Sequence, residues 1–334
     1  MKRRPFVTQL ACAAALALAG ASASAQTVLK FSHTDQPGGA RQAAAIIFAK
    51  SVENYSQGRV KVQVFPAGQL ATDPKAVEQL QLGGIDLTVT GTGTYATHIP
   101  TLNLMLMPYL VDTYDQGWRL YDSSAWLKKQ FDQGPSKGFR ILAIWEAGFR
   151  SMTTKGPLNS PEDAKGKKLR TYPNEMQRWL LEAMGFSIQI LPMTEVYLAI
   201  QQNVVWGQEN PIDTIYANKL YEVAPNVTLT QHVYSPIPLA ISEKTWQRLS
   251  IEDREAVTRA ARETADWIRR EIRANDERQL ADMTAKGAKV ARPPLEPFRK
   301  SVQPAYAKAK EKYGADVDTV LAEAASVRKA LPAK

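Results

Sequence analysis

Residues 168–206 read KLRTYPNEMQRWLLEAMGFSIQILPMTEVYLAIQQNVVW, and this stretch decides the fold class. It opens with a strand-like run at 168–172, continues as a helical segment at 174–184, and returns to a strand at 187–191. A second helix is predicted at 194–203, beginning at a threonine that can cap it. Strands that alternate with helices predict a mostly parallel sheet covered by helices.

The N-terminal part of the chain shows the same alternation. Strands are predicted at 28–32, 59–65 and 85–90, and the second of these (RVKVQVF) alternates polar and apolar residues. Helices are predicted between them, at 43–55 and 74–82. The chain therefore contains two α/β units, one at its start and one in its middle.

A different pattern begins at Ser250, which can cap a helix with an acidic first turn. Helical periodicity then continues to about Lys286. A helix of this length outside any strand–helix–strand unit is suited to brace two lobes. Two lobes without a flexible linker predict a shared cleft, and open α/β sheets bind ligands beyond the carboxyl ends of their strands.

The first 25 residues form a predicted export signal. Residues 2–4 are basic, an apolar run of about ten residues follows at 10–19, and Ala23-Ser24-Ala25 is a cleavage site. The run is too short to span a bilayer, and no later stretch approaches ~18 apolar residues. We therefore expect a soluble periplasmic chain that begins at Gln26 and keeps about 309 of the 334 residues, enough for two domains.

Cys12 is the only cysteine and lies inside this signal. The mature chain is thus expected to have no disulfide, thiol nucleophile or cysteine metal ligand, and export without disulfides fits a bacterial periplasm. A lipid anchor on Cys12 is the alternative, but almost no apolar run precedes it.

The composition is that of a globular protein, with 44% hydrophobic and 22% charged residues. The formal charge is +9, of which residues 2–4 contribute +3, leaving about +6 on the mature chain. The basic residues are scattered singly, with no basic run of five or more, so nucleic-acid binding is not expected. The positive excess can attract anionic ligands.

The sequence contains no G-x-S-x-G, H-E-x-x-H or P-loop motif. His33, His98 and His232 lack metal-ligand spacing, so each is expected to be a surface or hydrogen-bonding residue. Residues 91–96 (GTGTYA) match the dinucleotide-binding pattern G-x-G-x-x-A, but Pro100 limits the following helix to about one turn. We therefore expect a tight turn beside a pocket, with no cofactor and no metal.

Two arginines at predicted strand ends could bind an anion. Arg150 follows a predicted strand at 141–145, and Arg170 ends the run at 168–170. A planar guanidinium group pairs with a carboxylate through two hydrogen bonds. An arginine in this position is more often a surface residue, so the assignment depends on the surrounding sequence.

The surrounding strings resemble the solute-binding proteins of tripartite ATP-independent periplasmic (TRAP) transporters, over essentially all of the mature chain. The strings that carry the resemblance are KLRTYPNEM (168–176), LPMTEVYLAIQQ (191–202) and VWGQENP (205–211), supported by PAGQL (66–70), GID (84–86), SPED (160–163), GKK (166–168), YEV (221–223) and His232. Their order and spacing make the resemblance specific.

The resemblance implies an α/β fold of the periplasmic-binding-protein type, with two α/β lobes, a central ligand cleft and a long C-terminal bracing helix. Lobe I would comprise residues 26–147 and about 236–275. Lobe II would comprise residues 148–235 and about 276–330. Hinge strands would join the lobes, which would close over the ligand.

The resemblance also implies which residues bind the ligand. Arg170 would pair with the ligand carboxylate, Arg150 would be a second basic position, and Asn210 would hydrogen-bond the ligand near that carboxylate. The other implied pocket residues are Asn174 and Met193 from lobe II, and Thr34, Asp73, Gly91 and Thr92 from lobe I.

Two positions depart from the family pattern. Met193 stands where the family commonly has an aromatic residue, and Trp206 where it has an aspartate. Trp206 could stack on a bulky or aromatic part of the ligand, or it could pack on the underside of its lobe. A ligand with one carboxylate and a modest or aromatic tail is expected; a dicarboxylate is the alternative, since Arg150 could take a second anionic group.

We therefore predict a monomeric binding protein without catalytic activity, which delivers a small organic carboxylate to the integral membrane subunits of a TRAP transporter. One alternative is the ligand-binding component of a periplasmic sensor. Another is an exported enzyme acting on a carboxylate, for which Glu209 and Asp213 are the obvious acid–base candidates near Asn210.

Overall fold

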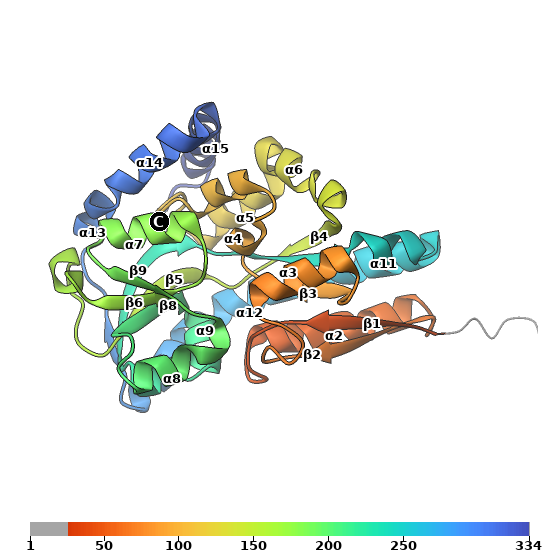
Figure 1. Ribbon diagram of the computed structural model, residues 1–334, viewed down its shortest axis with the longest axis horizontal. Helices are drawn as coiled ribbons and strands as arrows, with labels where there is room; N and C mark the ends of the chain where they lie inside the picture. Colours follow the sequence, from red (N-terminus) through yellow and green to blue (C-terminus); the bar gives the residue numbers. More distant parts are fainter. Residues whose placement is uncertain (1–25, 334) are drawn as a thin grey trace, which may run out of the picture.

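The computed structural model describes residues 26–333, so the predicted export signal and Cys12 lie outside the described residues. The chain forms two α/β lobes, each built on one sheet; in Figure 1 the red and orange elements of the first lie to the right and the green elements of the second to the left. Within residues 26–333, no helix has both the length and the apolar character needed to cross a membrane.

The sheet of lobe I has the order β2-β1-β3-β10-β4. Its strands are β1 (Thr27–Ser32), β2 (Val60–Phe65), β3 (Leu87–Val89), β4 (Phe139–Trp145) and β10 (Ile237–Ser242). β1 pairs in parallel with β2 and β3, because α2 (Ala40–Tyr55) and α3 (Asp73–Leu82) return the chain along the sheet. Phe31, Phe48 and Trp145 pack edge to face in the core, with ring centroids 5.8–6.2 Å apart.

The sheet of lobe II has the order β11-β9-β5-β8-β6-β7. Its strands are β5 (Phe149–Thr154), β6 (Lys168–Thr171), β7 (Ser187–Ile190), β8 (Gly207–Pro211), β9 (Asn226–Tyr234) and β11 (Lys289–Ala291). The alternation predicted at 168–206 is confirmed, with α7 (Glu175–Ala183) and α8 (Val196–Gln201) between parallel strands β6, β7 and β8. Thr194 does not cap α8, because the 3-10 turn η4 (Met193–Glu195) precedes that helix.

Both sheets are mostly parallel, as predicted, but each contains one strand that runs against the others. β10 runs antiparallel to β3 and β4, and β5 runs antiparallel to β8 and β9. The chain passes from one sheet to the other three times, between β4 and β5, between β9 and β10, and between β10 and β11. A strand that enters from the other lobe is not part of a local strand–helix–strand unit, so the unit's parallel pairing does not extend to it.

The long helix α12 (Ile251–Ala285) braces both lobes, as predicted. Ser250 caps it by accepting a hydrogen bond from the backbone N of Asp253 at 3.1 Å. Its first half packs into the core of lobe I through residues such as Val257 and Ile268. Its second half packs on lobe II, where Met283 lies in the same cluster as residues of α9 (Ile212–Ala217).

The C-terminal helices also contact both lobes. α14 (Gln303–Tyr313) packs on α7, whereas α15 (Ala315–Ala330) packs on α5 (Tyr114–Ser123) and η1 (Pro100–Leu106). We therefore propose the predicted lobe boundaries with one change, the transfer of α15 to lobe I. The remaining helices are α4 (Thr92–Tyr95), α6 (Ala125–Phe131), η2 (Gly134–Lys137), η3 (Pro161–Ala164), α10 (Leu220–Val223), α11 (Glu243–Arg248) and α13 (Glu296–Ser301).

A buried carboxylate ties the first two crossings together. Glu146 lies in the first crossing and is 1% exposed. It accepts hydrogen bonds from Trp118 Nε1 at 2.7 Å, from the hydroxyl of Tyr234 at 2.6 Å, and from the backbone N of Ala147 and Gly148 at 3.0 and 2.8 Å. Burial raises the pKa of Glu146, and the hydrogen bonds from Tyr234, Trp118 and the Gly148 backbone oppose the increase. Because Tyr234 ends β9, the carboxylate links the first crossing to the second.

Replacing Glu146 should destabilise the protein strongly. Glu146→Ala leaves four buried donors without their acceptor, and we expect a loss of about 3–5 kcal/mol in the free energy of unfolding. Urea unfolding followed by circular dichroism measures this loss. Glu311→Ala, which removes an exposed carboxylate of α14, is the matched control and should change the free energy by less than about 0.5 kcal/mol. Similar stability for the two variants would contradict the role assigned to Glu146.

Candidate functional site

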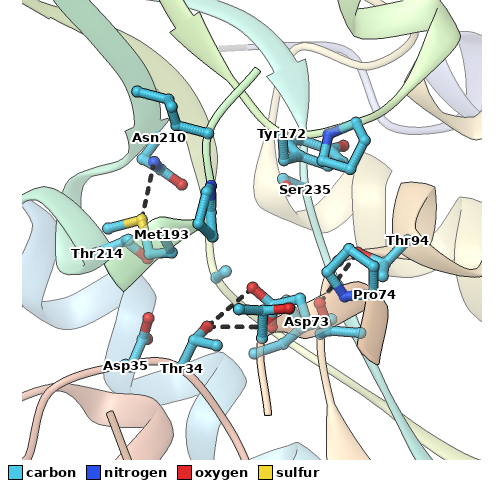
Figure 2. A pocket seen from close by; sticks show the side chains of 18 of the residues that line it. Thr34, Asp35, Asp73, Pro74, Thr94, Tyr172, Met193, Asn210, Thr214 and Ser235 are labelled. Carbon is cyan, nitrogen blue, oxygen red and sulfur yellow. Dashed lines mark hydrogen bonds between the residues drawn. The ribbon is translucent and has the colours of Figure 1, made fainter. Parts of the chain in front are cut away.

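A cavity of about 360 Å³ lies between the two lobes. The wall from lobe I comes from the turn after β1, the start of α3 and the turn after β3, and the wall from lobe II comes from β5, β6, η4 and β8. Figure 2 shows Thr34, Asp35 and Asp73 on one side of the cavity and Met193, Asn210 and Tyr172 on the other. The cavity thus opens beyond the carboxyl ends of β1, β3 and β6, as expected for open α/β sheets.

Arg170, at the end of β6, is a buried cation without an anion. It is 2% exposed, and its Nε and Nη2 donate hydrogen bonds to the carbonyl O of Leu191 at 2.9 and 2.7 Å. Among residues 26–333, no carboxylate forms an ion pair with it. Burial lowers the pKa of Arg170 to about 10, so the group is still charged at neutral pH. An anion in the cavity would neutralise this charge.

Arg150 also lines the cavity, but its charge is already compensated. Its Nη2 donates to Glu209 Oε1 at 2.9 Å and to Asn210 Oδ1 at 3.1 Å, and its Nε pairs with Glu209 Oε2. Glu209 accepts further hydrogen bonds from the hydroxyl of Thr171 at 2.9 Å and from His232. Burial alone would raise the pKa of Glu209, but Arg150 and His232 hold it at about 2. A second ligand carboxylate would therefore find no free charge on Arg150.

Met193 lies between two potential donors to a ligand. Its Sδ is 4.0 Å from Arg170 Nη1 and 3.9 Å from Asn210 Nδ2, the second contact being drawn in Figure 2. Asn210 Nδ2 also donates to Gln208 Oε1 at 2.5 Å, which holds the amide in place. Sulfur is a weak acceptor, so a carboxylate oxygen would replace it with stronger hydrogen bonds.

The lobe I wall carries two carboxylates with different partners. Asp35 forms an ion pair with Arg41 at 3.1 Å. Asp73 accepts a hydrogen bond from the Thr34 hydroxyl, whose oxygen lies 3.0 Å from Asp73 Oδ1 and 2.9 Å from Asp73 Oδ2. Gly91 also lines the cavity, in agreement with the expected tight turn beside a pocket.

Three predicted ligand-binding residues do not line the cavity. The ring centroids of Trp206 and Phe186 are 6.5 Å apart, and Lys167 Nζ lies 5.6 Å from the ring centroid of Trp206. Trp206 therefore packs within its lobe, which is the second of the two alternatives given above. Thr92 is buried and donates to the carbonyl O of Pro236 at 3.2 Å in the second crossing.

The third, Asn174, joins the lobes instead. Its Oδ1 caps α7 by accepting from the backbone N of Gln177 at 3.0 Å. Its Nδ2 donates to the carbonyl O of Gly93 at 3.0 Å and to Asn103 Oδ1 at 2.7 Å, both in lobe I. The sequence places Asn174 near the cleft but cannot distinguish a ligand contact from this contact between lobes.

Several cavity residues were not selected from the sequence. Asp35 follows Thr34 directly, and Tyr172 lies two residues beyond Arg170, so proximity to predicted site residues was an available signal. Arg41, Thr214 and Ser235 had no such signal, because α2, α9 and the second crossing bring them to the cavity.

Asp213, the other acid–base candidate, forms a contact between lobes. Its Oδ2 accepts a hydrogen bond from the backbone N of Ala40, the first residue of α2, at 3.0 Å. Its Oδ1 accepts from Gln279 Nε2 of α12 at 2.7 Å. Burial raises the pKa of Asp213 to about 6, with a further increase from the negative charge of Asp35, while the two hydrogen bonds oppose the shift.

Comparison with known proteins places this architecture in a family. A family profile described as bacterial extracellular solute-binding protein, family 7, matches residues 31–312. The sialic acid-binding periplasmic protein of Vibrio cholerae is 34% identical over 289 residues, which cover 86% of this chain and 90% of that protein.

Solved structures give the same result. A sugar acid binding protein of Advenella mimigardefordensis in complex with galactonate has a TM-score of 0.87 at 30% identity, covering 90% of this chain and 99% of that chain. A TRAP periplasmic solute-binding protein of a Polaromonas species bound to D-erythronate has a TM-score of 0.85 at 32% identity, covering 89% and 99%.

The raised pKa of Asp213 predicts a pH dependence of stability. A carboxyl group with a folded-state pKa of about 6, against 3.8 ordinarily, binds its proton more tightly in the folded than in the unfolded chain. Its contribution to the free energy of unfolding therefore rises as pH falls from about 7 to about 4. Between pH 7.5 and pH 5, the melting temperature of the wild type should rise relative to that of Asp213→Asn. Asp266→Asn, which changes an exposed acid of α12, is the control, and its melting temperature should differ from that of the wild type by the same amount at both pH values. If the difference between the wild type and Asp213→Asn is also the same at both pH values, the prediction is wrong.

Proposed function

The chain belongs to the bacterial extracellular solute-binding proteins of family 7, and from this membership we propose that its interlobe cavity captures a small organic carboxylate. It is the solute-binding component of a TRAP transporter and works with the integral membrane subunits of that transporter. The family is periplasmic. We further propose that export uses the predicted signal, with cleavage before Gln26.

The observation that carries the proposal is the buried, uncompensated charge of Arg170. A ligand carboxylate beside it would gain charge-assisted hydrogen bonds of about 1.5–3 kcal/mol each. Asn210 Nδ2 is a second donor, since it contacts the same sulfur atom, Met193 Sδ, as Arg170 Nη1. The relatives bound to galactonate and D-erythronate support a carboxylate as the ligand class.

Binding is coupled to movement of the lobes. Residues of both lobes line the cavity, so a ligand that contacts both walls stabilises the closed arrangement over an open one. The closed form then docks on the membrane subunits and releases the ligand to them.

We propose binding without catalysis. Glu209 is held as an ion pair with Arg150, and Asp213 accepts hydrogen bonds from Ala40 and Gln279. Both are thus committed to contacts within the protein, so neither acid–base candidate is free to act on a ligand.

Removing the guanidinium group of Arg170 tests the proposal. Arg170→Ala should weaken binding of the best organic acid at least tenfold, since at least one charge-assisted hydrogen bond is lost. Isothermal titration calorimetry on protein freed of bound ligand measures the dissociation constant. Arg178→Ala, at an exposed position of α7, is the control and should bind as the wild type does. Unchanged affinity in Arg170→Ala would refute the proposed binding mode.

A further inference from the structure

The wall opposite Arg170 carries a second, unmatched charge. Resting on the proposed capture of a carboxylate at Arg170, we propose that Asp73 and Thr34 form a subsite that recognises a ligand hydroxyl group. The ligand is then a hydroxylated monocarboxylate, with its carboxylate at Arg170 and a hydroxyl donor at Asp73.

Asp73 is a carboxylate with spare acceptor capacity. It is half-buried in the cavity wall, and the single proton of the Thr34 hydroxyl is shared between its two oxygens. In the part of the chain that the structure describes, no cation lies within ion-pair distance of it. It is the first residue of α3, and the positive end of a helix favours an ionised carboxylate. An ionised carboxylate only accepts hydrogen bonds, so the ligand group that meets Asp73 must be a donor.

A second ligand carboxylate does not fit this wall. It would face the negative charge of Asp73, and like charges in a partly buried site are mutually destabilising. Arg41 is already paired with Asp35, and Arg150 with Glu209. A dicarboxylate would therefore bring one negative charge more than the free cation Arg170 can neutralise.

A hydroxyl group fits better than an ammonium group. An ammonium group brought to this half-buried position would lose more hydration free energy than a neutral hydroxyl group, and both can donate a hydrogen bond to Asp73. The hydroxyls of Thr94, Thr214 and Ser235 also line the cavity, and each can donate to or accept from a further ligand hydroxyl.

Two series of acids of equal chain length test the inference. The four-carbon series is erythronate, butyrate, succinate and 4-aminobutyrate, and the six-carbon series is galactonate, hexanoate, adipate and 6-aminohexanoate. Calorimetry with protein freed of bound ligand should give, in at least one series, a hydroxy acid that binds at least tenfold tighter than the other three members. The inference is overturned if, in both series, the dicarboxylate or the amino acid binds as tightly as the hydroxy acid of that series.

The variant Asp73→Asn separates the subsite from the general affinity. It keeps the size of the side chain but removes its charge, and the preference for the hydroxy acid over the dicarboxylate should fall at least tenfold. Glu53→Gln, at an exposed position of α2, is the control and should keep the wild-type preference. Melting temperatures within a few degrees of the wild type establish that both variants are folded.

The outcomes distinguish this inference from the proposed function. If carboxylates bind and Arg170→Ala abolishes their binding, but Asp73→Asn keeps the wild-type preference, the proposed function stands and the inference falls. If none of the eight acids binds, the proposed function fails and the inference fails with it.

Discussion

Arg170 holds a positive charge that is 2% exposed and has no carboxylate partner among residues 26–333. Moving a charge out of water costs several kcal/mol unless an opposite charge compensates it. The carbonyl of Leu191 accepts two hydrogen bonds from the guanidinium and orients it, but a neutral acceptor does not cancel its charge. The empty cleft is therefore electrostatically unfavourable, and a bound anion removes that penalty. This difference between the empty and the filled cleft is the source of affinity from which the other features of the site follow.

Arg150 is in the opposite situation, although its sequence context is similar. Glu209 neutralises it, and Thr171 and His232 satisfy the remaining acceptor capacity of that carboxylate. The Arg150 guanidinium also donates a hydrogen bond to Asn210 Oδ1. The amide nitrogen of Asn210 therefore faces Met193 Sδ and the cavity. Arg150 therefore acts on a ligand through the orientation of Asn210. Among the described residues, Arg170 is then the buried cation of the cleft without an ion-pair partner, which favours a ligand with one carboxylate.

The sequence predicts those features that depend on residues close together in the chain, and it does not predict those that depend on contacts between distant segments. The alternation of strands and helices at 168–206 and the long helix after Ser250 depend on local periodicity and capping, and both were predicted. The antiparallel entries of β5 and β10 depend on strands that arrive from the other lobe, for which no local pattern exists. The site divides in the same way. Arg170 and Asn210, which line the cavity, were selected through strings that resemble a known family, whereas the side on which Trp206 packs depends on Phe186, which is distant in the sequence.

Two charged cleft residues have no ion-pair partner within residues 26–333, and they lie on different lobes: Arg170 on β6 and Asp73 at the start of α3. The lobes also share contacts that involve no ligand, such as Asn174 with Gly93 and Asp213 with Ala40. A ligand that reaches only Arg170 gains its interaction from lobe II alone, so it binds without favouring closure. A ligand that also satisfies Asp73 gains energy only when the lobes approach, because a population shifts only by the difference in affinity between its states. Selectivity therefore acts on closure as well as on capture, and a carboxylate without a hydroxyl donor in the right place would occupy the cleft without producing the form that docks on the membrane subunits.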